Sequence, residues 1–100
     1  MMYITKTNGR YVVTTVRKGL LRNIMHSTGL DTPAQVGAYM KANLRFARKD
    51  YTEHVVFECD TLLAVFRETG GDMLLNEHHR ADEGELYAMC ERVFKEKYRR

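Results

Sequence analysis

The chain has 100 residues, of which 44% are apolar and 29% are charged, and this composition is typical of a soluble globular protein and excludes a disordered chain. Its longest apolar run covers residues 62–66, which is far too short for a membrane-spanning helix. The first residues lack the architecture of a signal peptide, and no Pro-rich or Gly-rich linker divides the chain. We therefore expect a single compact domain over residues 1–100, in the cytoplasm and without a membrane partner.

Positive and negative charge are separated along the chain. Residues 1–50 carry nine Lys and Arg against two acids, whereas residues 51–100 carry seven bases against eleven acids. Bases near the C-terminal ends of helices compensate the helix dipole, which accounts for part of the positive charge. The remaining asymmetry predicts a polyanionic partner, or a basic face that meets an acidic one within the chain or in a homodimer.

The clearest local pattern is an N-terminal β-hairpin. Residues 3–7 and 10–16 are rich in β-branched and aromatic side chains, and Asn8-Gly9 between them supplies the two positive-φ residues of a type I′ turn. This turn predicts three cross-strand pairs: Thr7 with Arg10, Thr5 with Val12, and Ile4 with Val13. Both faces of the hairpin are partly apolar, so the pattern does not indicate which one packs on the core.

The next stretch has helical spacing. Residues 20–25 place apolar side chains at that spacing and predict a short helical turn or a loop, with Gly29 as a stop. Asp31-Thr32 followed by Pro33 is a strong start signal, and the apolar period that follows predicts a helix over about residues 33–48 with a basic flank. Residues 20–44 thus resemble the first helix, turn and second-helix start of a helix-turn-helix protein. Because the second helix would open with Pro33 and few base-reading side chains, we interpret the segment as a helical hairpin.

Residues 50–71 allow two interpretations. A helix would line Val55, Cys59 and Leu62 along one face and end at Gly70-Gly71. Strands at 55–57 and 62–66 would instead pair across a turn near Asp60. The helix has the cleaner periodicity and the strands have the better composition, and we favour the helix.

The last third predicts a short strand at 73–75 and a helix that starts around Ala81-Asp82-Glu83, with Asp82 as its N-cap. The fold class expected is therefore α+β. An N-terminal antiparallel β-hairpin, extended by residues 73–76 into a small sheet, would pack against two to four amphipathic helices.

The basic surface is the strongest functional candidate. A cationic β-ribbon can enter a DNA groove, and we expect a small nucleic-acid-binding or regulatory protein. The residues expected to contact phosphate lie on the hairpin, on its exit and on the flank of the 33–48 helix: Arg10, Arg17, Lys18, Arg22, Lys41, Arg45 and Lys49. The alternative is a protein-binding adaptor or inhibitor, of the type carried by mobile genetic elements, that docks through its charged faces.

Catalytic and metal-binding patterns are weak. His78-His79 with Asp82 or Glu83 is the one metal-like cluster, and adjacent histidines in a strand point to opposite sides. Cys59 and Cys90 are too few and too far apart for a disulfide framework or a zinc site. We expect neither enzymatic activity nor a metal or other cofactor.

Overall fold

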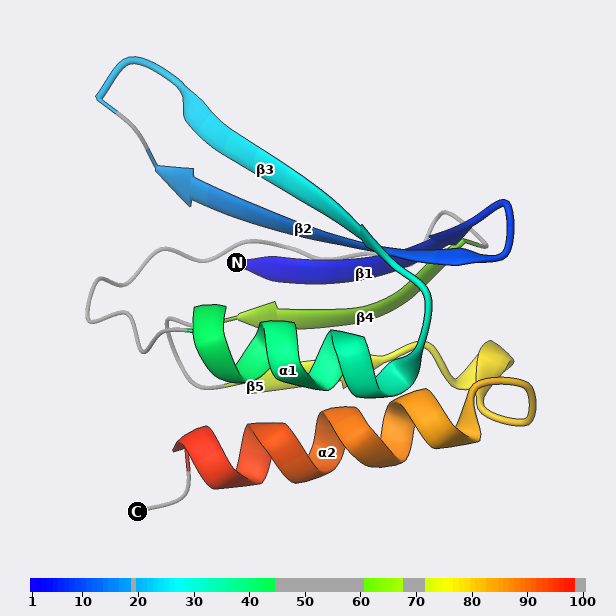
Figure 1. The fold of residues 1–100 in the computed structure, drawn as a ribbon. Helices are drawn as coiled ribbons and strands as arrows, with labels where there is room; N and C mark the ends of the chain where they lie inside the picture. The colour runs from blue at the N-terminus through cyan, green and yellow to red at the C-terminus, as the bar shows by residue number, and fades with distance from the viewer. Residues whose placement is uncertain (19, 45–60, 68–71, 99–100) are drawn as a thin grey trace.

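Five antiparallel strands form one sheet, and two helices lie side by side across one of its faces (Figure 1). The computed structural model describes residues 1–18, 20–44, 61–67 and 72–98. The strand order is β3-β2-β1-β4-β5, which places β3 and β5 at the two edges. The elements are β1 (Met2–Thr7), β2 (Arg10–Lys18), β3 (Asn23–Leu30), α1 (Pro33–Asn43), β4 (Leu62–Arg67), β5 (Asp72–Leu75), a 3-10 turn η1 (Glu77–His79) and α2 (Gly84–Tyr98).

The predicted N-terminal hairpin is confirmed as β1 and β2. Asn8 and Gly9 have φ of 52° and 76°, as a type I′ turn requires, and the three predicted cross-strand pairs are present. Ile4 and Val13 are opposite each other and fully buried. The face that carries them is therefore the core face, and it is the one that the helices cover.

Residues 20–22 form a bend, which fits the loop alternative. The helical turn is wrong for residues 23–25, because Asn23–Leu30 forms strand β3. It pairs with β2 over eight consecutive residue pairs, from Tyr11–Leu30 to Lys18–Asn23. The Thr14 and Ser27 hydroxyls lie 2.9 Å apart across the pair. A helix here would have needed a surface on which to bury its apolar stripe, and β2 instead offers a long β-branched strand with which to pair. The resemblance to a helix-turn-helix protein is therefore not reflected in the fold.

Helix α1 starts as predicted and ends earlier. Thr32 is its N-cap, Pro33 occupies its first turn, and Thr32 and Gln35 form a capping box. The helix ends at Asn43 because Leu44 adopts an extended conformation, with residues 45–48 lying outside the described residues. The Nζ of Lys97 donates to the Leu44 carbonyl oxygen at 2.5 Å and satisfies one of the groups left open at this helix end.

The helix favoured for residues 50–71 is wrong where the structure describes it, because Leu62–Arg67 is strand β4. The strand alternative was the better one for this segment, and residues 55–57 lie outside the described residues. Strand β4 is inserted between β1 and the predicted strand at 73–75, which is confirmed as β5. The hairpin and β5 therefore belong to one sheet without being neighbours.

The core lies between the sheet and the two helices. Helix α2 begins at Gly84, two residues after the expected N-cap Asp82. Gly37 of α1 lies against Met89 of α2, so that a Cβ at Gly37 would come within 2.5 Å of the Met89 sulfur. The largest fully buried side chains of this core come from both layers: Met2, Ile4, Val13, Val36, Met40, Leu63, Phe66, Leu86, Tyr87, Cys90 and Val93.

Candidate interaction surface

The cations predicted to form one basic surface are dispersed over the fold. Arg10 lies at the β1–β2 turn, where its Nε donates to Asp31 Oδ1 at 2.7 Å. Lys41 lies on the exposed side of α1, with its Nζ 3.7 Å from Glu96 Oε2 of α2. Each of these two cations already has an acid beside it, and Arg10 lies at the opposite end of β2 from Lys18. Arg45 and Lys49 lie outside the described residues.

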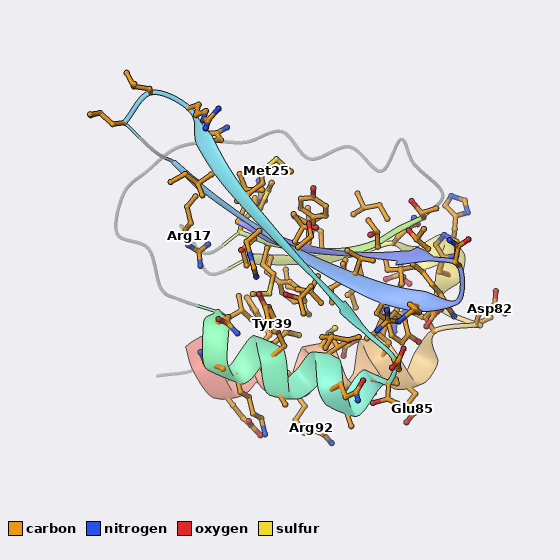
Figure 2. The ribbon with its side chains drawn as sticks, turned by 45° about the horizontal axis from the view of Figure 1, so that its top comes forward. Arg17, Met25, Tyr39, Asp82, Glu85 and Arg92 are labelled. Atoms are coloured by element: carbon orange, nitrogen blue, oxygen red, sulfur yellow. The ribbon has the colours of Figure 1, made fainter. Side chains whose placement is uncertain are left out.

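Three of the predicted cations are residues of the far end of β2 and of the segment just before β3. Arg17 lies on the helix side of the sheet, where its Nη2 donates to the Asn43 carbonyl oxygen at 3.5 Å. Lys18 is the last residue of β2, and Arg22 is exposed just before β3. Figure 2 shows Arg17 on the side of the helices and Met25 on the opposite side of the same pair of strands.

The same end of the sheet exposes large apolar side chains. Leu20 and Leu21 are 99% and 95% exposed, and Ile24 and Met25 are each 61% exposed. In Figure 1 the far ends of β2 and β3 project beyond the other strands and away from the helices. We call β2, β3 and their connection the ribbon, and we call Arg17, Lys18 and residues 20–25 the ribbon tip. An apolar cluster this exposed is typical of a surface that another molecule covers.

The charge of the ribbon is of one sign. Between Arg10 and Leu30 the sequence contains four bases and no acid, and the first acid after it is Asp31. The ribbon tip therefore combines four exposed apolar side chains with basic residues, of which Arg22 is exposed. The sequence predicted its cations but not the exposure of its apolar residues, whose helical spacing was interpreted as a short helical turn or a loop. The sequence signal for β3 was the length of β2, whose β-branched residues continue to Val16. A strand of that length indicates that another long strand pairs with it.

A buried polar cluster joins the hairpin to the start of α2. Glu83 is 5% exposed, and its two carboxylate oxygens accept from Lys6 Nζ at 2.8 Å and from the Tyr11 hydroxyl at 2.7 Å. Burial, followed by the hydrogen bond and the negative charge of Glu83, raises the pKa of Tyr11 to about 12. The Lys6 ammonium also lies 5.2 Å from the centre of the Tyr11 ring. Because all three groups satisfy one another, the cluster is a structural clamp.

A second polar anchor holds β4, β5 and α2 together. The Tyr87 hydroxyl lies 2.7 Å from the Asn76 carbonyl oxygen and 3.1 Å from that of Leu63. Asn76 is itself buried, and its side-chain amide donates to the Leu62 carbonyl oxygen at 2.9 Å. Burial and the negative charge of Glu83 raise the pKa of Tyr87 to about 12. The hydrogen bonds of these groups therefore stabilise the fold.

The histidine pair and the buried cysteine do not assemble a reactive site in the part of the chain that the structure describes. His78 and His79 lie in η1, and no group of three His, Cys, Asp or Glu side chains there is arranged to hold a metal ion. Burial raises the pKa of the Cys90 thiol to about 12, so that this cysteine stays protonated at neutral pH. Cys59 lies outside the described residues.

The chain matches no protein-family model, no curated protein and no solved structure with which it was compared. Among its described residues, neither helix has the length and apolar character needed to cross a membrane.

Proposed function

We propose that the chain is a protein-binding module, an adaptor or an inhibitor, whose ribbon tip docks into a partner with an apolar recess and an acidic rim. The observation that carries the proposal is the near-complete exposure of Leu20 and Leu21, next in sequence to the exposed Arg22. Burying one leucine side chain contributes about 1.5–3 kcal/mol, whereas an exposed ion pair contributes about 0–1 kcal/mol. On these magnitudes the leucines would supply most of the affinity, and the cations would orient the approach.

A second candidate function is nucleic-acid binding, and the acid-free ribbon favours it. A two-stranded antiparallel ribbon fits the major groove, and apolar side chains can wedge between base steps in the minor groove. Of the cations predicted to contact phosphate, Arg10 and Lys41 lie beside acids. At the tip, Arg17 already donates to the Asn43 carbonyl oxygen, and this ranks nucleic acid below a protein partner.

Site-specific photo-crosslinking separates the two candidates. A photoreactive phenylalanine derivative replaces Leu21 at the tip or, as the matched control, Ala34 on the exposed side of α1. We expect an adduct from position 21 that nuclease leaves intact, with no such adduct from position 34. An adduct that nuclease removes would favour nucleic acid. Equal adducts from both positions, or none from position 21, would contradict docking through the tip.

A further inference from the structure

The outer edge of β3 presents backbone groups that bond to no other described strand. Val16 of β2 exchanges both of its backbone hydrogen bonds with Met1, at 2.8 and 3.0 Å, so its N–H and C=O point toward β1. In an antiparallel strand the backbone N–H and C=O of successive residues point alternately to the strand on one side and to the strand on the other. The residues of β2 that bond with β3 are therefore the two next to Val16 and every second residue from there along the strand. Their partners in β3 are Ile24, His26, Thr28 and Leu30. The residues of β3 that turn N–H and C=O outward are therefore Asn23, Met25, Ser27 and Gly29.

This edge has none of the usual protection against strand pairing. Natural edge strands carry lysine, proline, a bulge or very short length, each of which blocks the addition of another strand. Strand β3 has eight residues, contains no proline and no Lys, Arg, Asp or Glu, and pairs with β2 without a register shift. The edge strand on the other side, β5, has four residues and begins at Asp72, which pairs with Arg67. Of the two edge strands described, only β3 is both long enough and free enough of charged side chains to pair with another strand.

We propose that β3 pairs with β3 of a second copy, antiparallel, about a two-fold axis at His26. In this register Asn23 bonds with Gly29 of the second copy and Met25 bonds with its Ser27. The symmetric pairs complete the set, so that every outward N–H and C=O of the strand finds a partner. A shift by one bonding pair in either direction would leave some of these groups without one.

The charges around β3 select a second copy over an unrelated strand. The strand itself is neutral, so self-pairing places no like charges opposite each other. It is preceded by Arg22 and followed by Asp31, both exposed, and Asp31 also accepts from Arg10 Nε within its own copy. Antiparallel self-pairing brings Arg22 beside Leu30 and Asp31 of the second copy, at both ends of the joined strands. The edge is thus complementary to itself in backbone bonding and in flanking charge.

This inference does not depend on the proposed function, because it uses the backbone edge of β3 rather than the apolar side chains of the tip. It also differs from a homodimer in which the basic half of the chain meets the acidic half. Joining two edges would give one continuous ten-stranded sheet, with each copy contributing the five strands described.

Sedimentation velocity over a concentration series tests the proposal, with His26→Lys and His26→Gln as the paired variants. His26 is exposed, and at the two-fold axis it would face its own copy in a non-hydrogen-bonded pair with about 4.5 Å between Cα atoms. We expect the wild type and His26→Gln to dimerise alike, and His26→Lys to raise the dimer dissociation constant by about tenfold or more, because two cations would then oppose each other. Circular dichroism checks that all three proteins fold.

Hydrogen exchange at single amides identifies the surface used. The amides of Met25, Ser27 and Gly29 should gain protection as the wild type dimerises and lose it in His26→Lys. A wild type that stays monomeric at millimolar concentration would overturn the proposal. So would a dimer that tolerates His26→Lys or leaves these amides unprotected. Protection that appears only when another protein is added would assign the edge to a foreign strand instead.

Discussion

Removing the Tyr11 hydroxyl tests the clamp that ties the N-terminal hairpin to α2. In Tyr11→Phe the ring still fills its buried site, and the hydrogen bond to the Glu83 carboxylate is lost. A hydrogen bond to a charged group contributes about 1.5–3 kcal/mol to stability. Because Glu83 is 5% exposed, water cannot easily replace the lost donor. We therefore expect the free energy of unfolding to fall by about 2 kcal/mol, which for a chain of this length lowers Tm by about 8–16 °C.

The Lys6 side of the same clamp should matter less. The Lys6 side chain is 41% exposed, so solvent screens its ion pair with Glu83, and we expect Lys6→Met to cost no more than about 1 kcal/mol. Urea denaturation followed by circular dichroism measures both variants. The matched control is Tyr39→Phe, since no hydrogen bond to the Tyr39 hydroxyl occurs in the described part of the chain, and it should change stability by less than about 0.5 kcal/mol. A Tyr11→Phe cost no larger than that of Tyr39→Phe would refute the clamp.

Three further predictions follow from the core. Burial raises the pKa of Cys90 from 9.0 to about 12, so the thiol loses its proton at lower pH in the unfolded chain than in the folded one. The free energy of unfolding should therefore fall as pH rises from about 9 to 12, by up to about 1.4 kcal/mol per pH unit. Urea denaturation at each pH should show a shallower fall in Cys90→Ala, and an unchanged slope would contradict the assignment. Gly37→Ala should destabilise the wild-type chain, because the new methyl group would meet the Met89 side chain. In a Met89→Ala background the same substitution should stabilise the chain by up to about 1 kcal/mol, because alanine has the higher helix propensity. Thermal unfolding measures both effects, and equal effects in the two backgrounds would argue against this contact. Asn76→Ala should lower the free energy of unfolding by about 1–3 kcal/mol, because the Leu62 carbonyl loses the donor that the buried Asn76 supplies. Amide hydrogen exchange should rise first in β4 and β5. A loss of less than about 0.5 kcal/mol would contradict this role of Asn76.

The elements that sequence reasoning predicted correctly are those fixed by local chemistry. Asn8-Gly9 can form one kind of tight turn easily, and that turn sets the register of β1 and β2. Thr32 followed by Pro33 specifies where α1 starts. The Thr32 side chain accepts from a backbone N–H of the first turn that has no partner within the helix, and Pro33 has no N–H to satisfy. Neither feature depends on the rest of the chain.

The elements that were predicted wrongly depend on tertiary partners. Residues 20–25 have helical spacing, but a helix there needs a surface on which to bury Leu20 and Leu21, and the fold leaves both exposed. Residues 62–67 become a strand because β1 offers an edge with which to pair, and that edge is visible only once the sheet exists.

The candidate surface was predictable only in part, for the same reason. The positive charge of the hairpin exit can be counted in the sequence, and Arg17, Lys18 and Arg22 do lie around one end of the ribbon. Which acids approach the remaining cations depends on how the elements pack. Asp31 beside Arg10 and Glu96 beside Lys41 are contacts of the folded chain that no spacing rule reveals.

The binding affinity of the purified crosslinked partner tests the central claim, docking through the ribbon tip, most directly. Isothermal titration calorimetry compares the wild type with Leu20→Ser/Leu21→Ser and with the control Ala34→Ser on α1. We predict that the tip variant weakens binding by about a hundredfold, as expected for loss of apolar anchors at an interface, while the control binds as the wild type does. A change of less than about threefold in the tip variant would contradict the claim.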